Sequence, residues 1–273
     1  MATLNLSGLY VYPIKSAAGI AVSEARLTTR GLAHDRRWMV VDAQGRFITQ
    51  RRFPRMALIS VAIDEALKIN APGMGELVVP LISEADEFVE VEVWGDRCGA
   101  IAIPEARTWF TEFLQTDCQL VYMPGSSTRP AERGAFGDDT LVSFADAYPY
   151  LLISEASLTE LNRRLTEKGE QGVTMKRFRP NLVVSGVEMA HDEDQWTQMR
   201  IGEVAFDLPK LCARCSIPNV NPRTGDRGQE PSKTLATYRT WDRGIWFGQN
   251  CVAHSDDAVL RVGDVVEVME RKG

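Results

Sequence analysis

The sequence predicts a mixed α/β fold dominated by β-structure, with barrel-like sheets and a few helices. Segment 88–103 alternates strictly, with Val89, Val91 and Val93 on one side, which is typical of a half-buried strand. Many other apolar segments are short and are separated by Gly-containing turns. Helices and strands do not alternate regularly, as they would in a doubly wound parallel sheet.

The first 120 residues read mostly as strands. Residues 6–16 (LSGLYVYPIKS) form an apolar stretch that ends in a turn, and residues 36–50 predict two strands around an Ala-Gln-Gly turn. Residues 56–69 predict one strand, followed by an Ala-Pro-Gly turn. Residues 105–115 carry apolar side chains at helical spacing and therefore predict an amphipathic helix.

A polar, turn-rich segment over residues 123–140 interrupts this pattern, and it is typical of a linker between domains or of a loop beside a substrate. We place a domain boundary near its start. The predicted domains are residues 1–122 and residues 123–273.

The clearest helix of the second domain is predicted over residues 154–170. Ser157 and Glu160 have the spacing of a capping box, and Gly169 is expected to end the helix. Its apolar face is formed by three leucines: Leu158, Leu161 and Leu165. Short β segments with Gly turns follow at residues 179–186, 199–208 and 259–270.

The composition is that of a soluble globular protein, with 44% hydrophobic and 25% charged residues. The net charge of −6 argues against a general binder of nucleic acid or of membrane surfaces. No apolar run approaches the roughly 20 residues needed to cross a bilayer, and the N-terminal segment lacks the pattern of a secretory signal. We therefore expect a cytoplasmic protein without a nucleic-acid or membrane partner.

Two of the five cysteines, Cys212 and Cys215, lie three positions apart in LCARCSIPNVNP. The odd number and wide spacing of the cysteines argue against a disulfide framework. A zinc ribbon needs a second such pair, and an iron–sulfur cluster needs a run of close cysteines. Pro218 and Pro222 prevent the long helix that follows a thioredoxin-type pair. Two reduced thiols remain, although the pair alone is also compatible with a structural role or with zinc.

Several basic residues lie in rigid local contexts of this acidic protein: Lys15 after a proline, Arg36 in HDRRW, Arg179 in RFRPN and Arg214 between the two thiols. If the fold brings these cations together, they indicate an anionic ligand. The alternative is that each is a solvated charge or pairs with one of the 37 acidic residues.

Six strings in this sequence carry a resemblance to a known family. They are YPIKS, GLAHDRRWMVV, RFRPNLVVSG, CARC, EPSKTLATYR and FGQN. Their order resembles that of MOSC-domain proteins with an N-terminal β-barrel domain, in the group that contains bacterial YcbX and the mitochondrial amidoxime-reducing component. The resemblance covers essentially the whole chain. It implies an N-terminal β-barrel domain over 1–122, whose first strand and Lys15-Ser16 turn reach the cofactor site, and a MOSC domain over 123–273.

The resemblance also implies a molybdenum cofactor, whose metal is held by the thiolate of Cys215, a soft ligand that suits molybdenum. Asp146 matches a position near the metal, and we interpret Cys212 as a small buried hydrophobic residue. Residues that match cofactor contacts of the family are Lys15, Ser16, Arg36, Arg179, Asn181 and Arg214. Departures from the family pattern at Ala147, Tyr148 and Asn250 concern the outer pocket and hence the choice of substrate.

The implied activity is reduction of small N-hydroxylated compounds, such as hydroxylamines, amidoximes and N-hydroxylated bases. Asp146 or a bound water is the candidate proton donor. The sequence has no cysteine-rich ferredoxin-like domain of the YcbX type, so we expect electrons from a separate ferredoxin, flavoprotein or cytochrome. Two alternatives stay open: a sulfur carrier with a persulfide on Cys215, and a cofactor-binding protein without catalysis.

Overall fold

The computed structural model describes residues 3–81, 88–132 and 140–273, and it confirms the β-dominated mixed fold. Within these residues, seven strands form a closed barrel in the order β12-β13-β1-β19-β14-β15-β17, with β17 pairing back to β12. Neighbouring barrel strands are antiparallel, except for the parallel pair β12 and β13. The barrel strands are β1 (Leu4–Val11), β12 (Tyr150–Ser154), β13 (Leu182–Ser185), β14 (Trp196–Ile201), β15 (Val204–Ala213), β17 (Gly244–Ala253) and β19 (Val265–Arg271). The short strands β2 (Ile20–Val22) and β16 (Thr240–Trp241) pair with β1 and β17.

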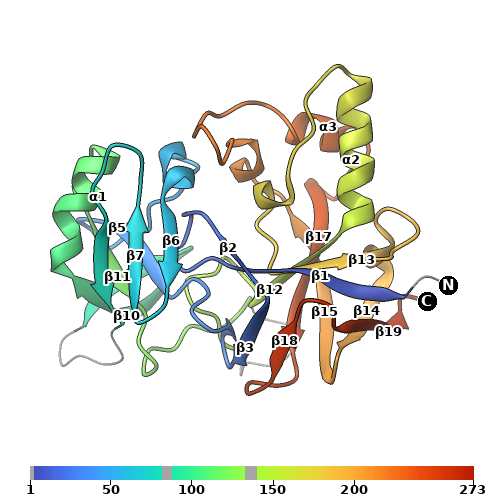
Figure 1. Ribbon diagram of the computed structural model, residues 1–273, viewed down its shortest axis with the longest axis horizontal. Helices are drawn as coiled ribbons and strands as arrows, with labels where there is room; N and C mark the ends of the chain where they lie inside the picture. The colour runs from blue at the N-terminus through green and yellow to red at the C-terminus, as the bar shows by residue number, and fades with distance from the viewer. Residues whose placement is uncertain (1–2, 82–87, 133–139) are drawn as a thin grey trace.

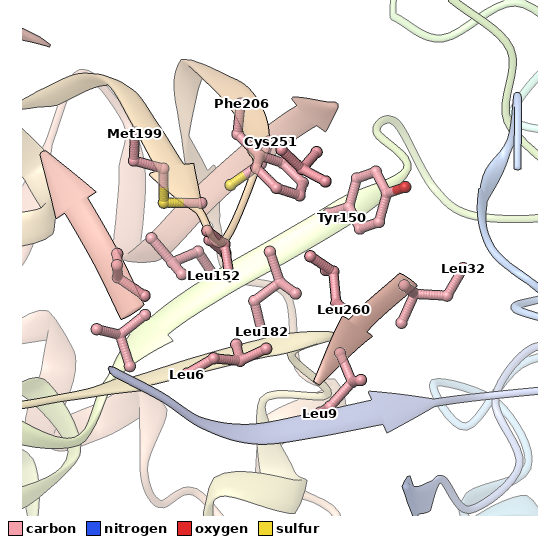
Figure 2. Close-up of a cluster of buried hydrophobic side chains, with 14 of the residues drawn as sticks. Leu6, Leu9, Leu32, Tyr150, Leu152, Leu182, Met199, Phe206, Cys251 and Leu260 are labelled. Atoms are coloured by element: carbon pink, nitrogen blue, oxygen red, sulfur yellow. The ribbon is translucent and has the colours of Figure 1, made fainter. Parts of the chain in front are cut away.

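Apolar side chains of the barrel strands pack into one buried cluster (Figure 2). Leu152, Leu182 and Phe206 come from three different strands of the barrel and are almost completely buried. Burial of this apolar surface, at about 25 cal/mol per Å², is the main stabilising contribution to the barrel.

The N-terminal part of the chain adds smaller sheets, which lie to the left of the barrel in Figure 1. A four-stranded sheet has the order β5-β11-β10-β9, and the order β6-β7-β8 forms a three-stranded sheet. A third sheet, β18-β3-β4, joins the two halves of the chain because β18 comes from the C-terminal part. These strands are β3 (Glu24–Thr28), β4 (Gly31–Leu32), β5 (Trp38–Asp42), β6 (Ser60–Ile63), β7 (Ala66–Asn70), β8 (Leu77–Pro80), β9 (Val89–Val93), β10 (Asp96–Ile103), β11 (Cys118–Tyr122) and β18 (Val259–Arg261).

Most of the predicted elements are confirmed. The amphipathic segment 105–115 contains α1 (Arg107–Leu114), and the alternating segment 88–103 forms the hairpin of β9 and β10. The segments 179–186, 199–208 and 259–270 contain strands β13, β14 with β15, and β18 with β19. A further short helix is α3 (Ser232–Ala236).

The helix predicted over 154–170 is α2 (Glu155–Glu167), and Gly169 follows its end with a φ of 74°. The predicted capping box is wrong. Ser154 is the N-cap, and its hydroxyl accepts a hydrogen bond of 3.1 Å from the backbone N–H of Ser157. Ser157 therefore lies inside the first turn, and Glu160 forms ion pairs with arginines of the following turn.

Two strand predictions are only partly right. In segment 36–50 the first strand is β5, but the return segment pairs with it through a single bridge between Val41 and Phe47. The strand predicted over 56–69 is split into β6 and β7 by a turn at Asp64. Both errors in the strand prediction have the same cause. The alternation of apolar and polar residues continues through the turns, so it does not show where the pairing between strands ends.

The site-bearing Lys15-Ser16 turn follows β1, which is a barrel strand paired with β13 and β19 from the second half of the chain. Ile14 then bridges to Trp38 of β5. The turn thus lies where the barrel meets the N-terminal sheets. The boundary at residues 122 and 123 stays a prediction, and residues 133–139 of the predicted polar segment lie outside the described residues. Among the helices of the described chain, none is long and apolar enough to cross a membrane.

Candidate functional site

A cavity of about 240 Å³ contains all of the predicted site residues in its wall. The predicted residues in this wall are Lys15, Ser16, Arg36, Asp146, Arg179, Asn181, Arg214 and Cys215. They come from five separate segments of the chain, and the fold brings these segments together. Ala147, Tyr148 and Asn250, the positions that depart from the family pattern, also line the cavity.

Charge distinguishes this cavity from the rest of an acidic protein. Six cationic side chains and two acidic ones are among its lining residues. Arg179 and Arg214 form no ion pair within the described residues. A site with such an excess of cations favours an anionic ligand, because guanidinium groups bind phosphate and similar oxyanions through paired hydrogen bonds.

Three of the lining residues have left-handed backbone conformations that non-Gly residues seldom adopt. The φ angles are 67° at Ser16, 50° at Arg36 and 58° at Arg179. Such conformations cost about 1–3 kcal/mol each and persist where the surrounding structure enforces them, commonly at binding sites. Here they turn three separate loops toward one cavity.

Arg36 and Arg179 both contact the ring of the buried Tyr12. Their guanidinium carbons lie 4.5 and 4.3 Å from the ring centroid. Gly19 allows this ring its position, since a Cβ there would lie 2.3 Å from a ring carbon. Burial lowers the pKa of Arg179 to about 10, with a further contribution from the charge of Arg36. Arg179 therefore remains a cation at neutral pH.

Arg36 is fixed by three acceptors. Its guanidinium donates to the buried carboxylate of Asp35 at 2.5 Å, to the side-chain oxygen of Asn181 at 2.9 Å and to the backbone oxygen of Arg179 at 3.3 Å. The amide nitrogen of Asn181 in turn donates to the backbone oxygen of Tyr10 at 3.1 Å. Asn181 therefore positions Arg36 against the barrel strand β1.

Asp146 collects three donors at the cavity wall. It accepts from the ammonium of Lys15, from the indole nitrogen of Trp94 at 3.0 Å and from Arg51 at 3.3 Å. Burial alone would raise the pKa of Asp146, but the charge and hydrogen bond of Lys15 outweigh it and hold this pKa well below its usual range. Asp146 is thus ionised at neutral pH.

Lys15 is almost completely buried, and burial lowers its pKa to about 8, although the Asp146 carboxylate offsets part of this effect. Its ammonium also donates to the backbone oxygen of Phe144 at 2.7 Å. The proton of Lys15 can therefore be lost within the pH range in which enzymes work.

This pKa predicts a pH dependence of anion binding. Lys15 is charged below pH 8 and becomes neutral above it, so the cavity loses one positive charge as the pH rises. We expect the affinity of the cofactor-free wild type for inorganic pyrophosphate, divided by that of Lys15→Met, to be constant below pH 7 and to fall up to about tenfold by pH 9, because the ligand's own protonation affects both proteins equally. Titration calorimetry of the wild type and of Lys15→Met checks this. A wild-type profile no steeper than that of Lys15→Met would contradict it.

Cys215 and Arg214 follow directly after β15, where Arg214 is held by a hydrogen bond of 2.7 Å from its backbone N–H to the backbone oxygen of Ile245. The guanidinium of Arg214 donates to the backbone oxygen of Phe178 at 2.8 Å and contacts the sulfur of Cys212 at 3.2 Å. Both thiols are half-buried, free and part of the cavity wall. The interpretation of Cys212 as a buried hydrophobic residue is wrong, because this end of β15 faces the cavity.

Several residues of the site were not predicted from the sequence. Arg51 and Tyr150 line the cavity, and the buried Arg129 fixes Asp146 by donating to the backbone oxygens of Ser143 and Ala145 at 3.0 and 2.6 Å. The run of basic residues around Arg51 was a visible signal. Tyr150 and Arg129 carried none, since their positions depend on the tertiary structure.

Comparison with known proteins gives matches along most of the chain. Residues 3–117 match the family described as "MOSC N-terminal beta barrel domain", and residues 139–267 match the "MOSC domain". The chain is 38% identical to "Mitochondrial amidoxime reducing component 2" of Rattus norvegicus, over 88% of this chain and 74% of that protein. Identity to "Mitochondrial amidoxime-reducing component 1" of Mus musculus is 35%, over 97% and 82%. Identity to "Molybdenum cofactor sulfurase" of Oryza sativa subsp. japonica is 34%, over 90% of this chain and 32% of that protein.

Proposed function

This chain belongs to the family of MOSC-domain proteins with a MOSC N-terminal β-barrel domain. We propose that it is a molybdenum-cofactor-dependent reductase of N-hydroxylated compounds. Its electrons come from a separate redox protein. Its similarity to amidoxime-reducing components and to a molybdenum cofactor sulfurase supports an oxidoreductase of amidoximes and a connection to the molybdenum cofactor.

The residues of the cavity fit such a cofactor, a pterin dithiolene with a phosphate group. The buried Nε atoms of Arg51 and Arg214 have no hydrogen-bond partner within the described residues. Both are donors, and a buried donor without an acceptor is unfavourable until a ligand supplies one. A thiol that suits molybdenum, Cys215, lies in the same wall.

In this proposal different cationic residues bind different parts of the cofactor. Arg36 and Arg179, both held against the ring of Tyr12, bind the phosphate through their planar guanidinium groups. Arg214 and the left-handed turn at Ser16 bind the remaining acceptors of the cofactor. Cys215 supplies its thiolate to the metal, and the cofactor, when bound, supplies the two-electron redox chemistry.

The proton balance assigns a role to the Lys15–Asp146 pair. Conversion of R–NH–OH to R–NH₂ breaks one N–O bond, consumes two electrons and two protons, and releases the oxygen as water. Asp146 is ionised and is therefore a poor acid, whereas Lys15 holds a proton with a pKa of about 8. We assign Lys15 as the group that delivers a proton and Asp146 as the group that orients it.

The observation that carries the proposal is the convergence of six cations and Cys215 on one cavity from segments far apart in the chain. The test is to purify the protein anaerobically from a host that makes the cofactor and from one that does not. Molybdenum and pterin content per chain is measured, followed by reduction of an amidoxime with reduced viologen. We expect near-stoichiometric metal and turnover in the first preparation only.

Other outcomes of this test would support other functions. Metal and pterin without turnover, with any donor, would favour a cofactor-binding protein. A preparation free of metal and pterin in which Cys215 carries a persulfide would favour a sulfur carrier, in keeping with the similarity to the molybdenum cofactor sulfurase of rice. Either result would overturn the reductase.

A further inference from the structure

Tyr150, the first residue of β12, combines a buried ring with a hydroxyl in the cavity wall. Its ring packs edge-to-face on Phe206, with 5.4 Å between the ring centroids, and belongs to the barrel core. Tyr150 also pairs with Cys251 of β17. The side chain is 2% exposed, so the ring cannot turn toward solvent without leaving the core.

The hydroxyl of Tyr150 has no hydrogen-bond partner within the described residues, although it is buried. Figure 2 shows its oxygen pointing away from the apolar side chains of the core. The nearby carboxylate of Asp35 does not satisfy it, because no hydrogen bond joins the two groups; this carboxylate instead accepts from the backbone N–H of Tyr12 at 2.8 Å and from Arg36 at 2.5 Å. An unpaired buried hydroxyl is unfavourable, and because this one belongs to a residue of the cavity wall, a molecule bound in the cavity can supply the missing acceptor.

Burial determines the protonation state of the Tyr150 hydroxyl. Burial raises the pKa of Tyr150, so the phenol stays protonated at all working pH values. It is therefore a neutral donor in a wall whose other unpartnered buried polar atoms, the Nε atoms of Arg51 and Arg214, are also donors. All three lack an acceptor.

We propose that Tyr150 is a further ligand-binding residue of this cavity, whose hydroxyl donates a hydrogen bond to an acceptor oxygen or nitrogen of the bound molecule. The inference rests on the proposed function only for the identity of that molecule. A neutral donor adds selectivity that the arginines do not, because it requires an acceptor atom at one place and not only negative charge.

The experiment uses Tyr150→Phe beside a matched control, Tyr238→Phe. Tyr238 also has a buried hydroxyl without a partner in the described part of the chain, but it does not line the cavity. Both substitutions remove one unpaired oxygen and keep the ring. In cofactor-free protein both should leave the thermal midpoint unchanged or raise it, whereas a clear fall for Tyr150→Phe alone would reveal a partner within the protein and overturn the proposal.

Binding is measured in two arms, each against Tyr238→Phe. For the full-length protein with cofactor, Tyr150→Phe should release pterin about fivefold faster, or raise the KM for the amidoxime about fivefold if the acceptor belongs to the substrate. For cofactor-free protein, the dissociation constant for inorganic pyrophosphate should rise by a similar factor if the acceptor is an oxyanion. A change in any of these supports the role of Tyr150.

If none of the three values differs between the two variants, the inference is overturned. A wild type that contains no molybdenum or pterin would refute the proposed function but not this inference, which is then decided by the pyrophosphate arm alone. The two failures are thus distinguishable.

Discussion

Cys215→Ala is expected to abolish amidoxime reduction and to change or remove the bound metal. Cys215 is half-buried in the cavity wall, directly after β15, and no neighbouring described residue has a thiol in the same wall except Cys212. Loss of outer-shell partners alone costs about 10–100-fold in metal affinity or activity, so loss of the ligand itself should exceed about 100-fold. Metal content, turnover and the absorption spectrum of the bound cofactor are measured together, because a spectral change shows that the metal environment has changed.

Cys212→Ala is the matched control, since it removes a second thiol from the same wall. Its sulfur contacts Arg214 at 3.2 Å, so we expect a modest loss, below about tenfold, through a less well fixed guanidinium. The metal and the spectrum should remain. Equal losses in both variants would show that the two thiols act as a unit and would refute the separate roles assigned here.

The site could be predicted from the sequence because its residues lie in short motifs whose prolines restrict the local backbone conformation. Lys15 follows Pro13, and Arg179 precedes Pro180, so the local backbone was already restricted. The cavity contains every residue that these motifs indicated. What the motifs could not show is the partner of each residue, as in the buried pair of Arg36 with Asp35.

Site residues that belong to no motif could not be predicted from the sequence, because only the tertiary structure brings them to the cavity. Tyr150 reads as an ordinary apolar residue at the start of a strand, and only the closure of the barrel through β12 and β17 places its hydroxyl at the cavity. The resemblance implied that the first strand reaches the site, but the pairing of β1 with strands of the second half of the chain was equally hidden. Pairing between residues about 175 positions apart, such as Leu9 with Leu182, leaves no periodicity in either segment.

Strands were predicted correctly where apolar and polar residues alternate along a segment that is paired throughout, as in β9. They were predicted wrongly where the same alternation continues beyond the residues that pair with a neighbouring strand. The return segment after β5 shows this. Phe47 alternates correctly and bridges to Val41, but the chain then turns toward Thr49 and Arg51, which line the cavity. The irregularity that defeats the strand prediction is therefore the feature that brings Arg51 to the site.

Arg36→Ala is expected to lower both stability and cofactor binding, and the two effects can be separated. Asp35 beside it has a side chain only 2% exposed, so removal of Arg36 leaves a buried carboxylate without its cation. Breaking such a pair costs about 3–5 kcal/mol, because the remaining charge is neither solvated nor paired. Urea unfolding of cofactor-free protein at pH 7 measures this, with Arg261→Ala as the control, whose partner Glu24 is exposed and whose loss should cost about 0–1 kcal/mol.

The double variant with Arg36→Ala and Asp35→Asn separates structure from binding. Removing the stranded charge should restore most of the lost free energy of unfolding, since the amide oxygen can still accept from the backbone N–H of Tyr12. Cofactor content should nevertheless stay low, because the guanidinium of Arg36, which binds the phosphate in our proposal, is still missing. If the double variant regains both stability and cofactor, Arg36 serves only to neutralise Asp35, and the phosphate must be bound by Arg179 and its other neighbours. Full cofactor content in Arg36→Ala itself would lead to the same conclusion.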